Sequence, residues 1–123
     1  MNDTEFLTTE EAMKVDAALL SSKGKFSARL AIYALRCLKQ ISQQESIPIE
    51  SVTPEAVQTW IESDEMIRKQ VELDSSFENF FTRLVLASLN PLRQTAESEN
   101  SSIAALTVEQ VVSWFEEQEK ILN

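Results

Sequence analysis

The sequence predicts an all-α protein, a compact bundle of about five helices built from a tandem two-helix repeat with pseudo-twofold symmetry. Three features carry this prediction. One glycine and three prolines in 123 residues are too few for turn-rich β architecture. Apolar residues recur at the spacing of one helix face. A stretch that begins at residue 53 also recurs 54 residues later.

The repeat extends well beyond that stretch. Residues 53–62 read TPEAVQTWIE, and residues 107–116 read TVEQVVSWFE. At the same offset, 15 of the 44 pairs from 26/80 to 69/123 are identical, whereas background composition would give roughly three. The sequence therefore predicts an internal duplication within one helical domain, residues 1–123, with repeat units at roughly 8–69 and 62–123.

Five helices are expected, at about 9–21, 26–43, 54–72, 77–95 and 107–122. The second and the fourth are predicted to be central, because apolar residues cover much of their surface. In the second helix these residues are Phe26, Leu30, Tyr33, Ala34, Cys37, Leu38 and Ile41. In the fourth they are Phe77, Phe80, Phe81, Leu84, Val85, Leu89 and Leu92. Pro91 removes a backbone donor in mid-helix, so we expect a kink near Asn90, or a helix that ends there and restarts.

Helix starts and loop anchors can also be predicted. Thr53 and Thr107 suit the N-cap position, because a hydroxyl accepts a hydrogen bond from a free amide of the first turn. The polar loops 44–52 and 96–106 are each anchored by central isoleucines, Ile47 with Ile49 in the first and Ile103 in the second. We expect all three isoleucines to be buried beneath their loops.

The composition excludes several kinds of chemistry. The chain has no histidine and a single cysteine, so it cannot supply a Cys/His zinc site or a His-dependent nucleophile. Cys37 lies in an apolar run and is expected to be a small buried hydrophobe. The acidic stretch ESENSSIAALTV lacks the glycine and the final carboxylate of a calcium loop. We therefore expect no catalytic residue, no metal and no cofactor, in a protein that is not an enzyme.

Charge and hydropathy limit the partners. A net charge of −9 disfavours nucleic acid and anionic membrane surfaces. No apolar stretch approaches the roughly 20 residues that cross a bilayer. The start, MNDTEFLTTEE, has no basic region followed by an apolar one, so it does not resemble a secretory signal. A cytoplasmic protein is the expectation.

Six residues form a candidate interaction surface: Lys25, Arg29, Arg36, Trp60, Arg83 and Trp114. The two tryptophans are either partner anchors or core residues, and their apolar stripe favours the core. The basic residues either bind an anion or pair with the chain's own acidic segments, such as 62–65 and 116–117. The excess of acidic residues favours such pairing.

The function predicted from these observations is a non-enzymatic protein-interaction, regulatory or adaptor protein that binds a protein partner through a helix face or groove. Symmetric surfaces also favour isologous contacts, which makes a homodimer plausible. The alternative is a carrier or sensor of a small apolar ligand within the bundle. That alternative requires a cavity of roughly 300 Å³ or more, lined by Leu30, Leu84 and their neighbours.

Overall fold

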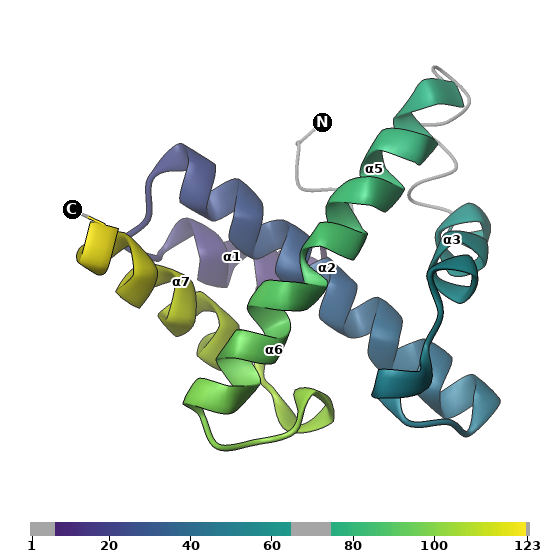
Figure 1. Ribbon diagram of the computed structural model, residues 1–123. Coiled ribbons are helices and arrows are strands. Elements are labelled where there is room, and N and C mark those ends of the chain that lie inside the picture. Colours follow the sequence, from purple (N-terminus) through teal and green to yellow (C-terminus); the bar gives the residue numbers. More distant parts are fainter. Residues whose placement is uncertain (1–6, 65–74, 123) are drawn as a thin grey trace.

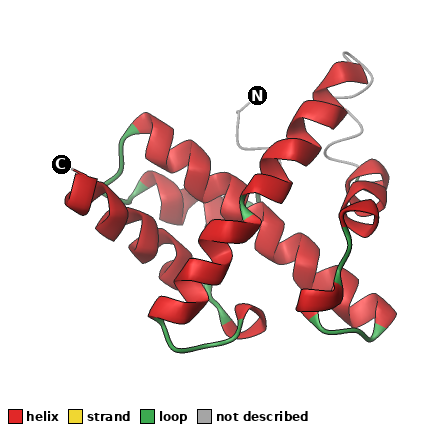
Figure 2. Ribbon diagram, in the orientation of Figure 1, coloured by secondary structure: helices red, strands yellow, loops and turns green. Residues whose placement is uncertain are grey.

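The computed structural model describes residues 7–64 and 75–122, and in the second range it describes side chains for 79–121. No β-strand occurs within this part of the chain (Figure 2), which confirms the all-α prediction. The elements are α1 (Thr9–Asp16), α2 (Ser22–Glu45), the 3₁₀ helix η1 (Ile49–Ser51), α3 (Pro54–Ser63), α5 (Ser75–Ala87), α6 (Leu89–Ser98), the 3₁₀ helix η2 (Ile103–Ala105) and α7 (Val108–Leu122).

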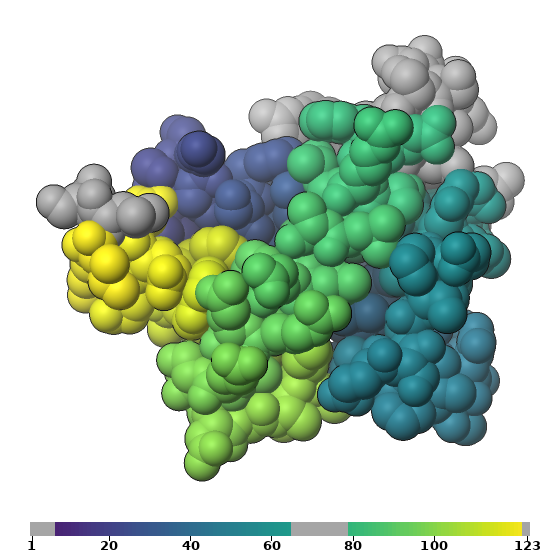
Figure 3. Space-filling view, viewed as in Figure 1, coloured from purple at the N-terminus to yellow at the C-terminus, as the bar shows by residue number. Residues whose placement is uncertain are grey.

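Helix α2 is the centre of the arrangement, because α1, α3, α5, α6 and α7 all contact it. α5 and α6 together cross α2, with α7 on one side of the crossing and α3 on the other (Figure 1). α1 packs against α2 and α7, and α3 packs against α5. The space-filling view shows α5 and α6 lying between α7 and α3 (Figure 3).

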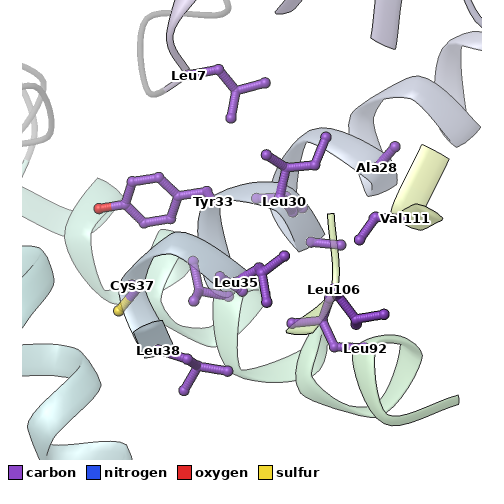
Figure 4. Close-up of a cluster of buried hydrophobic side chains, with 14 of the residues drawn as sticks. Leu7, Ala28, Leu30, Tyr33, Leu35, Cys37, Leu38, Leu92, Leu106 and Val111 are labelled. Carbon is purple, nitrogen blue, oxygen red and sulfur yellow. The ribbon is translucent and has the colours of Figure 1, made fainter. Parts of the chain in front are cut away.

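The core is built around α2, as its apolar pattern predicts. Tyr33 and Cys37 lie on one side of the buried cluster, while Leu92, Leu106 and Val111 lie on the other (Figure 4). The buried residues of α2 are Gly24, Ala28, Leu30, Ala31, Ile32, Tyr33, Ala34, Leu35, Cys37, Leu38 and Ile41. A helix that is buried on most of its circumference must be covered by several neighbours, and α2 is.

Two aromatic residues are an exception to the predicted burial. Phe26 is 45% exposed and Phe80 is 58% exposed, although both belong to the apolar faces predicted for the central helices. Leu30, one turn beyond Phe26, is buried, and so is Phe81 beside Phe80. Periodicity identifies the face of a helix, but the positions of neighbouring helices decide how far along that face the cover extends.

The first helix is shorter than predicted. α1 ends at Asp16 and not near residue 21, because the chain that follows is held by α7. The Leu19 amide donates to the Glu116 carboxylate at 2.9 Å, and the Ser21 amide donates to Glu119 at 3.0 Å. These hydrogen bonds give the Leu19 and Ser21 amides acceptors outside α1, so the two amides are satisfied without an extension of the helix.

The single glycine of the chain allows this contact. Gly24 lies in the first turn of α2, and its amide donates to the Ser21 hydroxyl at 3.0 Å. A Cβ atom at position 24 would lie 1.8 Å from a carboxylate oxygen of Glu119. Glycine therefore provides the space in which the Glu119 carboxylate reaches the start of α2.

The third helix also ends early. α3 ends at Ser63, and Asp64 has an extended backbone with ψ of 115°. The Asp64 carboxylate accepts a hydrogen bond of 2.6 Å from the Tyr33 hydroxyl, which ties this end of α3 to α2. The predicted continuation over 65–72 lies outside the described residues.

The predicted interruption at Pro91 is confirmed, and it occurs at Ser88 instead of Asn90. α5 ends at Ala87 and α6 begins at Leu89. Pro91 has no N–H to donate to the Ala87 carbonyl, so the helical ladder cannot run through this point. The Ser88 amide donates to both the Leu84 carbonyl at 3.2 Å and the Val85 carbonyl at 3.0 Å, as at a tightened helix end.

The connections that follow α2 and α6 share local conformations at the offset of 54 residues. Ser46 and Asn100 are the residues of positive φ, 54° and 53°, among the described non-glycine residues. Three residues beyond each lies the first residue of a 3₁₀ helix, Ile49 or Ile103, and both isoleucines are buried as predicted. Ile47, which was also predicted to be buried, is only half-buried. The Ile47 amide donates to the Ser42 carbonyl at 3.1 Å, and the Ser101 amide donates to the Ala96 carbonyl at 2.9 Å, so the two turns share a hydrogen bond. The left-handed residue follows α2 directly, whereas it comes two residues after the end of α6.

α3 and α7, the helices that follow these connections, also begin in the same way. The Thr53 hydroxyl accepts from the Ala56 amide at 3.1 Å, and the Thr107 hydroxyl accepts from the Gln110 amide at 3.2 Å. Both predicted N-caps are thereby confirmed. The duplication and the pseudo-twofold symmetry of the whole bundle stay predictions.

Candidate functional site: two grooves beside the central helix

The basic residues predicted on α2 lie beside acidic residues of α1. Arg29 forms an ion pair with Asp16 at 2.5 Å, and the Lys25 ammonium donates to the Asp16 carbonyl at 3.1 Å. Arg36 forms an ion pair with Glu11 at 2.9 Å. Both ion pairs join basic residues of α2 to acidic residues of the chain itself, as the sequence favoured, and these two partners belong to α1. Segments 62–65 and 116–117 were the predicted examples of such partners, and residue 65 lies outside the described residues.

The other predicted residues lie apart from one another. Arg83 is exposed on α5 and has no ion-pair partner in the described part of the chain. Trp114 is half-buried on α7, with its ring edge-on to Phe115 at 5.1 Å between centroids. Trp60 is half-buried on α3, edge-on to Tyr33 at 5.6 Å. Arg36 and Trp60 both contact the Tyr33 ring, whereas α7, which carries Trp114, lies on the other side of the α5–α6 crossing from α3 (Figure 1).

A groove of about 440 Å³ lies between α2 and the entry to α7, and we call it the α2–α7 groove. Glu11 of α1 bounds it at one end. Its lining residues come from three segments distant in sequence: Glu11, Ile32, Leu35, Arg36, Lys39, Gln40, Gln43, Leu106, Thr107 and Val108. Because Leu106 and Val108 are held by η2 and by the start of α7, the shape of the groove depends on tertiary packing.

The α2–α7 groove combines an apolar floor with a basic rim. The charge of Arg36 is balanced by Glu11, and its guanidinium lies 5.5 Å from the centre of the Tyr33 ring. Lys39 differs, because its ammonium donates to the uncharged Leu106 carbonyl at 2.8 Å. No carboxylate of the described residues pairs with Lys39. An ammonium has three donors, so Lys39 still offers charge and hydrogen bonds to a ligand.

A second groove, of about 270 Å³, lies between the end of α2 and α3, and we call it the α2–α3 groove. Its lining residues are Ile41, Gln44, Glu45, Glu55, Ala56, Thr59, Trp60 and Ser63. At 3.6 residues per turn, Ile41 and Glu45 point to the opposite side of α2 from Lys39 and Gln43. The two grooves therefore lie on opposite sides of the same helix.

Sequence reasoning found Arg36 and Trp60 but missed the grooves in which they lie. Lys39 and Gln43 follow Arg36 at spacings of three and seven residues, which places all three on one helix face. That spacing could have identified Lys39 and Gln43 as neighbours of Arg36 on the surface of α2. No pattern in the sequence brings Leu106 to this face, because the contact depends on how α7 approaches α2.

Neither groove matches the cavity that a carrier of an apolar ligand requires. Leu30 and Leu84 line neither one, and Leu30 is buried in the core. The carrier alternative therefore stays a prediction. Across the described ranges, no group of three or more acidic or cysteine side chains could hold a metal ion. In the same ranges, no helix combines the length and apolar character needed to cross a membrane.

The single cysteine is buried within this framework. Cys37 has no exposed surface, and burial, with Asp64 nearby, raises the pKa of its thiol to about 12. Because the thiolate is the reactive form, we expect alkylation by iodoacetamide at mildly alkaline pH to be at least about 100-fold slower in the native protein than in urea. Mass spectrometry of timed samples measures both rates. Comparable rates would contradict the buried position.

These features define a class of protein, an all-helical one with a buried central helix and surface grooves beside it. The family comparison is more specific. Residues 7–122 match the model of the family described as NDH complex assembly factor CRR9, and the chain belongs to that family. No curated protein and no solved structure matches the chain.

Membership in this family agrees with the function predicted from the sequence in its broad terms. The description of the family as an assembly factor of a complex implies protein partners and suggests a non-enzymatic role. The matched range, 7–122, includes every residue that lines the two grooves.

Proposed function

We propose that this protein is a non-enzymatic assembly factor that binds a protein component of the NDH complex in the α2–α7 groove. The observation that carries the proposal is the family match over residues 7–122, which spans the three segments that form the groove. The groove supplies what an assembly factor needs, a preformed surface that recognises another polypeptide without chemical change.

The chemistry of the groove indicates the kind of segment that it holds. Ile32, Leu35 and Leu106 offer an apolar floor, and Lys39 offers a positive charge with no carboxylate partner in the described residues. An apolar segment that carries an Asp or Glu side chain complements both features. A groove of this size holds only a few side chains, so we expect weak and reversible binding.

Charge reversal at the rim tests this proposal. We expect Lys39→Glu to reduce recovery of NDH complex subunits with the tagged protein by at least about tenfold, because the variant repels the partner's carboxylate. Quantitative mass spectrometry of affinity-purified material measures the recovery. Lys23→Glu is the matched control, since Lys23 is exposed in the first turn of α2 and lies outside both grooves.

Each result has a defined meaning. Equal recovery with Lys39→Glu and with the unmodified chain would exclude the groove as the binding site. Absence of NDH subunits from every sample would contradict the assembly function itself. Circular dichroism of the purified variants verifies that both remain helical.

Several narrower predictions accompany this proposal. A homodimer, one domain over residues 1–123 and a cytoplasmic location all follow from the sequence and stay predictions. Sedimentation at several concentrations tests the first, limited proteolysis tests the second, and imaging of a tagged chain tests the third.

A further inference from the structure

Trp60 forms part of the wall of the α2–α3 groove. Its ring contacts Tyr33 edge-on at a centroid distance of 5.6 Å, and the residue as a whole is half-buried and lines the groove. In the described residues, no acceptor bonds its indole N–H. A tryptophan that is anchored on one side and accessible on the other is a frequent energetic centre of protein interfaces.

Two carboxylates accompany this tryptophan. Glu45 lies at the end of α2 and Glu55 in the first turn of α3, and both line the groove and are exposed. Neither has an ion-pair partner among the described residues. None of the described residues that line this groove is basic, so its rim is acidic while that of the α2–α7 groove is basic.

Glu99 and Glu109 lie 54 positions beyond Glu45 and Glu55, and both have partners within the chain. Glu99, which corresponds to Glu45, accepts a hydrogen bond of 3.1 Å from the Gln110 side chain. Glu109, which corresponds to Glu55, pairs with the ammonium of Lys14. That contact lowers the pKa of the Glu109 carboxyl, chiefly through the hydrogen bond from the lysine.

A difference between the two halves of the chain explains why Glu45 lacks the partner that Glu99 has. Ala56 occupies the position that corresponds to Gln110, and alanine has no side-chain amide that could reach the glutamate at the end of the preceding helix. The bridge that Gln110 forms to Glu99 is therefore absent between Ala56 and Glu45. A groove lies there instead, beside Trp60.

We propose that the α2–α3 groove is a second binding site, which takes a Lys- or Arg-bearing segment of a protein partner. The cation pairs with Glu45 and Glu55 and lies against the face of Trp60, while apolar atoms of the segment contact Ile41. The pairing of Lys14 with Glu109 illustrates the same chemistry within the chain. This inference goes beyond the proposed function, because it concerns a different groove on the opposite side of α2.

Two grooves of opposite charge give the protein a way to connect two segments. An acidic segment in the α2–α7 groove and a basic segment in the α2–α3 groove would lie on either side of one rigid helix. Such an arrangement brings two polypeptide segments to a fixed separation and raises the effective concentration of each near the other.

Fluorescence anisotropy with two labelled peptides tests the second site. Both are 12-residue probes of equal leucine content, one with four lysines and the other with four glutamates. We expect the lysine probe to bind the unmodified protein at least about tenfold more tightly than the glutamate probe. We also expect Glu45→Gln/Glu55→Gln to weaken lysine-probe binding at least about tenfold, because glutamine keeps the shape and removes the charge.

The control has the same net charge as the test variant. Glu97→Gln/Glu117→Gln removes two exposed carboxylates that lie outside the groove, and it should leave binding of the lysine probe within about twofold of the unmodified protein. Equal weakening by both double variants would show attraction to overall charge and overturn the proposal. Failure of the lysine probe to bind the unmodified protein would overturn it as well.

A further variant separates this proposal from the proposed function. Lys39→Glu changes only the α2–α7 groove, so lysine-probe binding should persist in that variant. Loss of NDH subunits with retention of lysine-probe binding would support both proposals. Loss of lysine-probe binding in Lys39→Glu would contradict the independence of the two sites.

Discussion

Replacing Tyr33 by alanine is expected to destabilise the fold by about 3–5 kcal/mol, in the range for removal of a buried aromatic side chain. Tyr33 has no exposed surface. Its ring lies edge-on to Trp60 and to Phe81, at centroid distances of 5.6 Å and 5.1 Å. Its hydroxyl donates to Asp64 at 2.6 Å. One side chain therefore joins α2, α3 and α5.

The contributions of the ring and the hydroxyl can be separated. Burial raises the pKa of the Tyr33 hydroxyl, with the Asp64 contact as a second cause, so the group stays protonated and remains a donor. Tyr33→Phe should cost about 1 kcal/mol, because the partly exposed Asp64 can be hydrated after the bond is lost. Phe80→Ala is the aromatic control at an exposed position and should cost less than about 1 kcal/mol.

Urea unfolding followed by circular dichroism measures these differences in the free energy of unfolding. The expected order is Tyr33→Ala well above Tyr33→Phe, with Phe80→Ala the smallest. A cost below about 1 kcal/mol for Tyr33→Ala would contradict the position of Tyr33 at the junction of three helices.

Replacing Leu92 by alanine is expected to cost about 2–5 kcal/mol, since Leu92 has no exposed surface and its removal leaves a cavity in close-packed surroundings. Leu92 belongs to the same buried cluster as Leu35 and Leu106 (Figure 4). Those two leucines also line the α2–α7 groove. The substitution should therefore loosen the floor of the groove as well as the core.

The matched control is a leucine of opposite exposure. Leu19 is 82% exposed, and Leu19→Ala should change the free energy of unfolding by less than about 0.5 kcal/mol. Thermal and urea unfolding measure both variants under the same conditions. Similar costs for the two substitutions would contradict the packing of α6 on α2.

Local rules predicted much of the fold. The apolar pattern identified α2 as the central helix, the threonine hydroxyls marked the starts of α3 and α7, and Pro91 marked the break between α5 and α6. Each of these features depends on neighbouring residues of the chain, so a short stretch of sequence contains the necessary information.

The sequence did not predict the features of the fold that depend on contacts between distant segments. The end of α1 depends on carboxylates of α7, and the exposure of Phe26 depends on where its neighbours stop. The candidate surface was predicted as six residues, of which Arg36 lines the α2–α7 groove with Lys39 and Leu106, and Trp60 lines the α2–α3 groove. A groove belongs to the packing of helices that are distant in sequence, and periodicity within one helix does not describe it.

Site-specific photo-crosslinking tests the central claim most directly. A photoreactive amino acid replaces Gln40, an exposed residue that lines the α2–α7 groove, and in a parallel sample it replaces Lys23, which lies outside it. We expect crosslinks from position 40 to one subunit of the NDH complex, and at least about tenfold fewer from position 23. Equal crosslinking from both positions, or no NDH subunit crosslinked from position 40, would contradict the assignment of this groove as the binding site.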